Sequence, residues 1–303
     1  MKKAGLGQRI IWRMEVLAYD FICLLLKPFS FDQISRFGGW LLRKIGPLTS
    51  KHKIMQTGFD IAFPDLDDKA RQDLSREAWD NIGRTFAEFP IMSRVRVYQK
   101  DSRVTVIGKE HLEAVRKSGR GAIIITGHFA NWEVMAAALT QSGLPVRITY
   151  RKINNPHLDK RVREQRRAYG TKFLVPKSTH AGARQLLGAI DKGESIAILN
   201  DQKFNEGLAV PFFGEHAMTA TGPTRLALKT GASVLPISVI RDKAHFTVTI
   251  EPPFQIDDTG ERELDTEAGL RKIVAWTEDH IRKSPAQWFW MHRRWPKDLY
   301  KKT

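Results

Sequence analysis

The 303-residue chain carries 49 lysines and arginines against 33 aspartates and glutamates, which gives a formal net charge of +16 at pH 7. This excess predicts an anionic partner: nucleic acid, an anionic membrane surface, a phosphorylated substrate or an acidic carrier protein. A hydrophobic content of 42% excludes a chain that is disordered as a whole. The single cysteine, Cys23, excludes disulfides within the chain and zinc sites built from cysteines.

The sequence pattern of the first hundred residues predicts helices. Val16–Leu26 are apolar apart from Asp20, but this run is shorter than the ~17–25 residues of a membrane-spanning helix. No cleavage site of a signal peptide follows it. We interpret residues 9–28 as a helix that lies in the membrane interface, with Trp12 and Arg13 among its lipid-facing residues. An ordinary core helix is the alternative, and this segment alone favours neither.

Residues 1–100 are therefore predicted to form a helical extension, and residues 101–303 the main domain. In the main domain, short β-branched runs alternate with helical segments, which predicts an α/β fold with a largely parallel central sheet flanked by helices. The predicted strands are 104–107, 121–126, 146–150, 172–175, 195–199, 234–240 and 246–250. The main predicted helices are 110–118, 156–168, 180–191, 221–229 and 265–283, and the segment that carries 210–214 is predicted as a loop.

The stretch from Gly127 to Glu133 lies between a predicted strand and a predicted helix. If His128 and Glu133 were both helical, they would lie about 140° apart and would not meet. They meet only if His128 lies in the turn and Glu133 in the first helical turn, with Asn131 as the N-cap. A carboxylate beside the imidazole would fix its tautomer and make His128 a general base. A capped helix with a solvated histidine is the ordinary alternative.

Other polar residues follow the ends of neighbouring strands. Arg151 follows one strand, and Asp201, Gln202 and Lys203 follow another. Because the carboxyl ends of parallel strands meet at one edge of a sheet, we expect these side chains and His128 to face one cleft. Arg166, farther along a basic helix, is expected to reach this cleft from the side, unless it belongs to a solvated cationic surface.

The C-terminal stretch 285–295 combines tryptophan with arginine. Indole and guanidinium groups suit a membrane interface, where one end of the side chain is apolar and the other is wet. We therefore predict an interfacial tail; a packed C-terminal tail is the alternative. The residues concerned are Trp288, Trp290, Arg293, Arg294 and Trp295.

Taken together, these motifs resemble a known family. The sequence from His128 to Glu133 is similar to the HxxxxE motif of the bacterial lipid A late acyltransferases of the HtrB/MsbB type, relatives of the glycerol-phosphate acyltransferases, which carry HxxxxD. The resemblance covers nearly the whole chain. Its further blocks are Tyr150-Arg151 with Asn155-Pro156 and Arg166, Asp201-Gln202 with 210–214, Thr221-Gly222 with Arg225-Leu226-Ala227, Val234-Leu235-Pro236 and 287–295.

The resemblance implies a glycerol-phosphate acyltransferase-like fold and an enzyme on the cytoplasmic face of the bacterial inner membrane. It would transfer a fatty acyl chain from acyl carrier protein to a hydroxyl on a Kdo2-lipid IV(A)-type precursor of lipid A, in contact with membrane lipid. The net positive charge agrees with these acidic and phosphorylated partners. No cofactor, metal or nucleic acid is expected.

The residue roles implied by this reading start from His128 as general base, oriented and charged by Glu133. Arg166 and backbone N–H groups would stabilise the oxyanion, and Asp201 would orient Arg166 or the acceptor. Arg151 would hold a phosphate group. The other expected substrate-binding residues are Asn131, Gln202, Lys203 and Arg225.

Two alternatives stay open from the sequence. The nearer is another glycolipid acyltransferase, such as one that acylates a phosphatidylinositol mannoside from acyl-CoA. The more distant is a non-enzymatic nucleic-acid-binding protein, which the net charge of +16 alone suggests.

Overall fold

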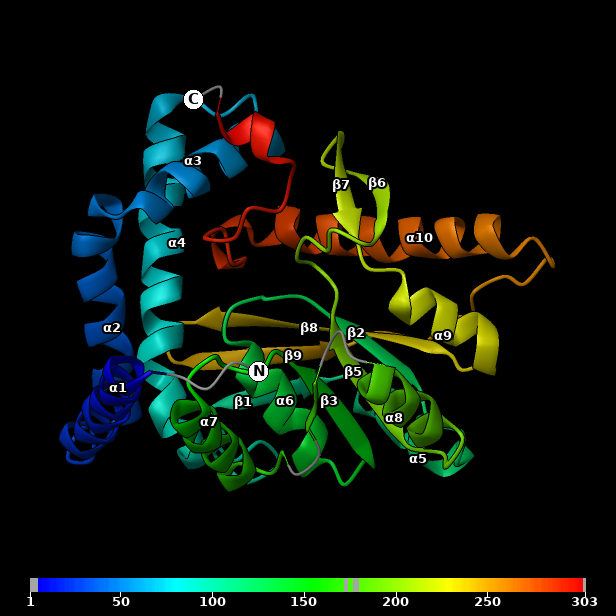
Figure 1. Ribbon diagram of the computed structural model, residues 1–303, viewed down its shortest axis with the longest axis horizontal. Helices are drawn as coiled ribbons and strands as arrows, with labels where there is room; N and C mark the ends of the chain where they lie inside the picture. The colour runs from blue at the N-terminus through cyan, green and yellow to red at the C-terminus, as the bar shows by residue number, and fades with distance from the viewer. Residues whose placement is uncertain (1–4, 172–173, 177–179, 302–303) are drawn as a thin grey trace.

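A seven-stranded sheet forms the centre of the computed structural model, which describes residues 5–171, 174–176 and 180–301 (Figure 1). The strand order is β1-β9-β8-β2-β5-β3-β4, and neighbouring strands are parallel except for the antiparallel pair β8–β9. This confirms the predicted fold class. The strands are β1 (Val104–Ile107), β2 (Ile123–Thr126), β3 (Val146–Tyr150), β4 (Leu174–Pro176), β5 (Ser195–Leu199), β8 (Val234–Asp242) and β9 (His245–Ile250). Residues 172–173, half of one predicted strand, lie outside the described residues.

The helices of the main domain cover both faces of this sheet. They are α5 (Lys109–Ser118), α6 (Trp132–Gln141), α7 (Pro156–Ala168), α8 (His180–Ile190), α9 (Gly222–Thr230) and α10 (Arg262–Lys283). In β2, Ile124 packs in the cluster that contains α6, whereas Ile123 and Ile125 pack in the cluster that contains α8 and α9. Because successive side chains of a strand point to opposite faces, a strand buried on both faces reads as the continuous apolar run seen here.

One structural element was absent from the sequence prediction. The segment predicted as a loop forms a separate antiparallel hairpin of β6 (Leu208–Phe212) and β7 (Glu215–Thr219). Its turn residues Phe213 and Gly214 both have positive φ, 52° and 79°. Such a turn is strongly favoured in two-residue hairpins, but Pro211 inside the first strand hides the strand pattern in the sequence.

Most of the chain from Leu6 to Arg94 is helical, as predicted, and much of this region shares the hydrophobic core of the sheet. The division into domains at about residue 100 stays a prediction. The helices are α1 (Leu6–Leu25), α2 (Phe31–Ile45), α3 (Ser50–Ala62) and α4 (Asp68–Glu88), and the short 3-10 helices of the chain are η1 (Gly46–Leu48), η2 (Phe89–Arg94), η3 (Pro285–Gln287) and η4 (Lys297–Tyr300).

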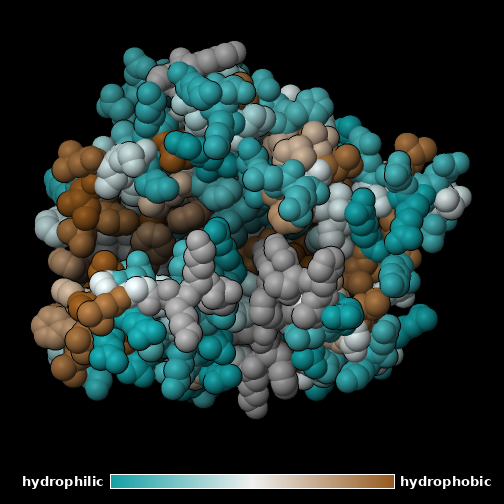
Figure 2. Space-filling view, viewed as in Figure 1, coloured by the Kyte–Doolittle hydropathy of each residue, from teal (hydrophilic) through white to brown (hydrophobic). Residues whose placement is uncertain are grey.

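Helix α1 is not a core helix, because none of its residues is buried. It contacts α7, where the Asn155 side chain donates to the carbonyl of Trp12 at 2.9 Å and Arg161 pairs with Asp20 at 2.8 Å. Figure 2 shows apolar side chains gathered on the side of the molecule where Figure 1 places α1 and α2. We call this surface the apolar N-terminal face; its exposed residues are Leu6, Ile10, Ile11, Met14, Leu17, Phe21, Ile22, Leu24, Leu25, Phe29, Phe37, Trp40, Ile45 and Leu48. No helix in the described part of the chain has both the length and the apolarity of a membrane span.

Helices α2 and α4 approach each other through glycines. A Cβ atom added to Gly83 would overlap the backbone carbonyl of Gly38, and one added to Gly38 would overlap that of Gly83. We expect Gly83→Ala to lower the free energy of unfolding by about 1–3 kcal/mol, because the helices must separate. Gly188→Ala in α8 is the matched control, since nothing lies within 4 Å of the added atom. Urea denaturation of both variants measures this, and equal stability would contradict the close approach.

Candidate active site

The site begins where two adjacent parallel strands end. Thr126 in β2 pairs with Leu199 in β5, so the residues that follow leave the sheet at the same edge. His128 Nδ1 lies 2.8 Å from Oδ1 of Asp201, and the backbone N–H of His128 donates to Oδ2 of the same carboxylate at 2.7 Å. The Trp288 indole N–H also donates to Oδ2, at 2.8 Å. Strand order thus brings His128 and Asp201 into direct contact.

The Asp201 carboxylate is fixed in position and in charge. Its side chain is only 2% exposed. Burial by itself raises the pKa of this carboxyl, but the charge of His128 and the hydrogen bonds from His128 and Trp288 hold the pKa well below its ordinary value. An ionised carboxylate only accepts hydrogen bonds, so Nδ1 of His128 carries the proton. In the neutral imidazole the other ring nitrogen, Nε2, is then an acceptor.

The second ring nitrogen of His128 faces polar and aromatic groups. Gln202 Nε2 lies 3.2 Å from His128 Nε2 and donates to it in this tautomer. The imidazole ring packs against Trp132 at 4.9 Å and Phe289 at 6.0 Å between ring centroids. With its side chain 16% exposed, His128 is accessible to a reacting group.

Glu133 makes other contacts than those predicted. His128 lies outside the helix and Glu133 in the first turn of α6, as predicted. However, the Glu133 carboxylate accepts from Arg166 at 3.1 and 2.5 Å and from the Tyr169 hydroxyl. The prediction that Glu133 orients His128 is therefore wrong. The fork of Arg166 and the Tyr169 hydroxyl satisfy both carboxylate oxygens, and Asp201 takes the place beside the imidazole.

The positive charge of Arg166 is consequently paired with the Glu133 carboxylate. Burial works against its charge, but the Glu133 carboxylate raises the pKa of the Arg166 guanidinium above its ordinary value. Asp201 was predicted to orient either Arg166 or the acceptor. The first of these roles is wrong, since Asp201 binds His128 and Trp288, and the second stays a prediction. Tyr169 was absent from the sequence prediction. Its position in the chain, three residues after Arg166, is the signal that would have placed it on the same side of the helix end.

Asn131 is a structural residue rather than a substrate ligand. Its side-chain oxygen accepts from the Glu133 backbone N–H at 3.1 Å, as predicted for an N-cap. Its amide nitrogen donates to Oε2 of Glu88 at 2.8 Å, and the residue is fully buried. The predicted role of Asn131 in substrate binding is therefore wrong, because both ends of its amide are used inside the protein.

The remaining predicted substrate-binding residues lie at or near the surface. Arg151 is exposed directly after β3, Lys203 is half-buried after β5, and Arg225 is exposed on α9. No hydrogen bond joins any of these side chains to another residue in the part of the chain that the structure describes. Their roles stay predictions. Within residues 5–171, 174–176 and 180–301, no three or more histidine, cysteine or carboxylate side chains converge in a metal-binding arrangement.

The tryptophan-rich tail is packed inside the protein. Trp288, Trp290 and Trp295 are each at most 2% exposed, and Arg294 is 1% exposed. Trp295 donates to the carbonyl of Phe212 at 2.9 Å, and Arg294 donates to the hairpin strand β7. The prediction that these residues contact the membrane is wrong, because the three indole N–H groups and both terminal guanidinium nitrogens of Arg294 donate to protein groups in the interior. Of the predicted set, Arg293 alone is exposed.

The tail also supports the turn that carries His128. Phe129 forms a β-bridge with Trp288, and the backbone N–H of Ala130 donates to the carbonyl of Gln287 at 2.6 Å. Figure 1 shows this C-terminal segment returning from α10 toward the N-terminal helices α3 and α4. The segment predicted to form an interfacial tail thus packs against the turn that carries His128.

Comparison with known proteins gives consistent relatives. The chain is 26% identical over 301 residues to the lipid A biosynthesis palmitoleoyltransferase of Escherichia coli (strain K12), covering 96% of this chain and 89% of that protein. It is 26% identical over 253 residues to the lauroyltransferase of the same organism, covering 80% and 78% of the two chains. It is also 25% identical over 232 residues to the phosphatidylinositol mannoside acyltransferase of Mycolicibacterium smegmatis (strain ATCC 700084 / mc(2)155), covering 75% and 74%.

Among solved structures, the crystal structure of the 1-acyl-sn-glycerophosphate acyltransferase PlsC from Thermotoga maritima matches with a TM-score of 0.39 and 16% identity, covering 82% of this chain and 99% of that one. The family model of the bacterial lipid A biosynthesis acyltransferases matches residues 8–297. Because that model accounts for almost the entire sequence, the chain belongs to the bacterial lipid A biosynthesis acyltransferase family.

Proposed function

We propose that this acyltransferase moves a fatty acyl chain from acyl carrier protein to a hydroxyl on a phosphorylated lipid A precursor of the Kdo2-lipid IV(A) type, with His128 as general base. The observation that carries the mechanism is the pair formed by His128 Nδ1 and Asp201 Oδ1, 2.8 Å apart. This pair leaves Nε2 of His128 as the proton acceptor once the acceptor hydroxyl takes the place of the Gln202 amide, which donates to Nε2 at 3.2 Å. The acceptor hydroxyl then serves as nucleophile, and no serine or cysteine of the protein is needed.

Both proton transfers of the proposed reaction pass through His128. His128 Nε2 takes the proton of the acceptor hydroxyl as its oxygen bonds to the thioester carbonyl carbon. When the carbon–sulfur bond breaks, the same proton passes to the departing thiolate. Asp201 stabilises the imidazolium between these two steps. Because Arg166 is paired with Glu133, the backbone N–H groups at the start of α6 that Asn131 does not cap are the better candidates for stabilising the oxyanion.

Charge supports the choice of partners. Acyl carrier protein is acidic and the acceptor is phosphorylated, and this chain has a net charge of +16. Two exposed arginines, Arg151 directly after β3 and Arg225 on α9, are suited to hold a phosphate group. Lys203 and Gln202 lie next to Asp201 on the same loop and complete the proposed acceptor side.

The apolar N-terminal face supports a membrane-bound location. Helix α1 presents large apolar side chains to solvent, and Arg13 on the same helix is exposed. A helix of this kind binds in the plane of the interface, where apolar side chains enter the lipid and cations meet phosphate groups. We propose that this face attaches the enzyme to the cytoplasmic side of the inner membrane, where the lipid A precursor is found.

The mechanism predicts losses of kcat of different size when either of two carboxylates is replaced. Asp201→Asn removes the charge beside His128, so kcat should fall roughly a hundredfold or more, the scale expected for loss of a general base. Glu133→Gln removes a partner of Arg166, so it should lower the melting temperature while kcat of the folded protein falls less than ~tenfold. Single-turnover acyl transfer beside a melting curve measures both. Equal losses of kcat would contradict the assignment of Asp201 as the orienting group.

Donor and acceptor are tested together by mass spectrometry. Purified protein should form one new ester on Kdo2-lipid IV(A) from an acyl carrier protein thioester, and His128→Ala should form none. Acyl-CoA with a phosphatidylinositol mannoside serves as the competing pair, since a relative that carries that name is 25% identical to this chain. Product only from the competing pair would overturn the proposed substrates and leave the site chemistry intact.

Membrane attachment is tested with two exposed leucines. Leu17 on α1 is 68% exposed and Leu264 on α10 is 64% exposed. Leu17→Glu combined with Phe21→Glu should weaken sedimentation with anionic phospholipid vesicles by roughly tenfold or more, because two side chains no longer enter the lipid. Leu264→Glu should sediment like the unaltered protein. Equal sedimentation of all three proteins would place the attachment elsewhere.

A further inference from the structure

Ala130 has an unfavourable backbone conformation next to the catalytic residue. Its φ is 42°, in the left-handed region that disfavours any side chain with a Cβ atom. Such a conformation persists only where the surrounding structure fixes it. Ala130 lies between His128 and the helix cap Asn131, so the groups that hold it also determine where the imidazole lies.

Both polar groups of the Ala130 backbone are held from outside the motif. Its N–H donates to the carbonyl of Gln287 at 2.6 Å, and its carbonyl accepts from the Thr85 hydroxyl at 2.8 Å. The Thr85 hydroxyl oxygen also lies 2.8 Å from the carbonyl of Asn81, so these two carbonyls share its proton. One support thus comes from the C-terminal segment and the other from α4.

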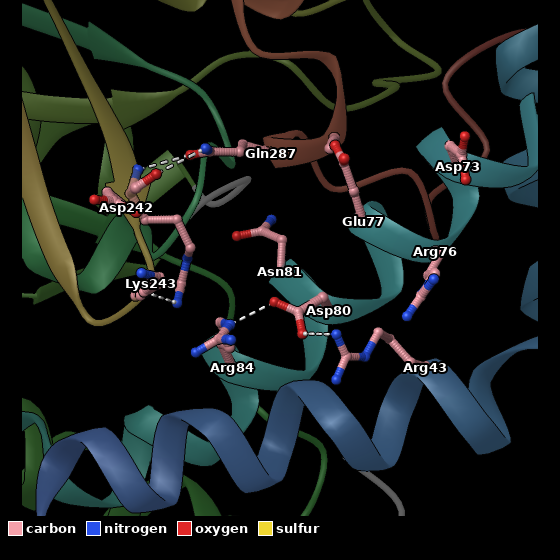
Figure 3. A pocket seen from close by; sticks show the side chains of 12 residues that line it. Arg43, Asp73, Arg76, Glu77, Asp80, Asn81, Arg84, Asp242, Lys243 and Gln287 are labelled. Atoms are coloured by element: carbon pink, nitrogen blue, oxygen red, sulfur yellow. Dashed lines mark hydrogen bonds and ion pairs between the residues drawn. The ribbon is translucent and has the colours of Figure 1, made fainter. Parts of the chain in front are cut away.

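Arg241, near the end of β8, joins these two supports. Its backbone N–H donates to the side chain of Gln287 at 2.7 Å, and its carbonyl accepts from the same side chain at 3.0 Å. Its guanidinium donates to Thr85 Oγ1 at 2.9 Å, which leaves the hydroxyl proton of Thr85 for the carbonyls. Figure 3 shows the Gln287 side chain pointing toward β8 across the top of a cavity of about 380 Å³.

Glu88 completes the arrangement on the same side. Its carboxylate accepts from Arg241 at 2.7 and 3.0 Å and from the Asn131 amide at 2.8 Å. The Glu88 and Arg241 side chains are 0% and 5% exposed. A buried ion pair adds little stability over an apolar pair of the same size, and it is retained in some proteins because it specifies one geometry.

We propose that Arg241 and Glu88 are positioning residues for acyl transfer, which hold the turn from His128 to Asn131 in its reactive conformation. The inference rests on the proposed function of His128 as general base. Neither residue has a hydrogen bond to His128 or Asp201 in the described part of the chain, so both act through Ala130 and Asn131. A displacement of about 1 Å at a reacting group is enough to cost a hundredfold in rate.

The test uses conservative variants of Arg241 and of Thr85, the residue through which Arg241 reaches the Ala130 carbonyl. Arg241→Lys keeps a cation beside Glu88 but loses the fork that reaches Thr85. Thr85→Val removes the hydroxyl from a side chain of similar shape, and Thr85→Ser restores the hydroxyl. Arg76→Lys is the matched control, since Arg76 is an exposed arginine on the wall of the same cavity.

Positioning predicts a particular kinetic pattern. In Arg241→Lys and Thr85→Val, kcat should fall roughly tenfold to a hundredfold while KM changes less than ~threefold, because the loss is in the transition state. Thr85→Ser should recover most of kcat, and Arg76→Lys should equal the unaltered protein. Unchanged kcat in the first two variants would overturn the proposal. The proposal would also be overturned if kcat fell in proportion to the fall in melting temperature and Thr85→Ser did not recover it.

A substrate-free measurement separates this proposal from the proposed function. Amide hydrogen exchange in the segment 127–133 should be faster in Arg241→Lys and Thr85→Val than in Arg76→Lys, while exchange in β2 stays unchanged. If the unaltered protein transfers no acyl chain to the lipid A precursor, the proposed function fails and exchange still decides the positioning. Equal exchange in the segment 127–133 of all variants would overturn the positioning role.

Discussion

The candidate active site depends on one buried carboxylate. The Asp201 carboxylate accepts hydrogen bonds from the imidazole Nδ1 and the backbone N–H of His128 and from the indole N–H of Trp288, at 2.7–2.8 Å. A charged carboxyl in an apolar interior is stable only when its oxygens are paired and hydrogen-bonded. The same three contacts fix the tautomer of the histidine, the path of the catalytic turn and the position of the C-terminal segment. Chemistry and folding therefore depend on the same group.

Around this carboxylate, three distant parts of the chain meet. The turn after β2 provides His128, the turn after β5 provides Asp201, and the C-terminal segment provides Trp288. A second buried pair, Glu133 with Arg166, connects the start of α6 to the end of α7. Because α7 also contacts α1, the apolar N-terminal face and the catalytic helix are joined through one helix. The arrangement places the proposed lipid surface next to the site that would use a lipid substrate.

Much of the fold could be predicted from local pattern. The strand–turn–helix at His128, the cap at Asn131 and the alternation of strands and helices depend on nearby residues, so the sequence contains their signals. The partner of His128 could not be predicted in this way. It depends on β5 being the neighbour of β2, and these strands are far apart in the chain. Glu133 lies close to His128 in the sequence and Asp201 lies far from it, and only the tertiary structure shows that Asp201 is the partner.

The C-terminal segment shows a different limit of sequence reasoning. Tryptophan beside arginine has the same composition in a membrane interface and in a packed core with satisfied donors. Trp295 donates to the carbonyl of Phe212 at 2.9 Å, and Arg294 lies over the ring of Phe212 at 4.7 Å. These partners come from elsewhere in the fold, so only the tertiary structure distinguishes the two settings.

The central claim is that Asp201, and not Glu133, sets the tautomer of His128. Nitrogen NMR of protein labelled at histidine, with the His128 signal assigned by substitution, measures this directly. We predict that at neutral pH the proton of His128 is on Nδ1, that Asp201→Asn shifts it partly to Nε2, and that Glu133→Gln leaves it on Nδ1. A proton on Nε2 in the unaltered protein, or a tautomer that responds to Glu133→Gln and not to Asp201→Asn, would contradict this account.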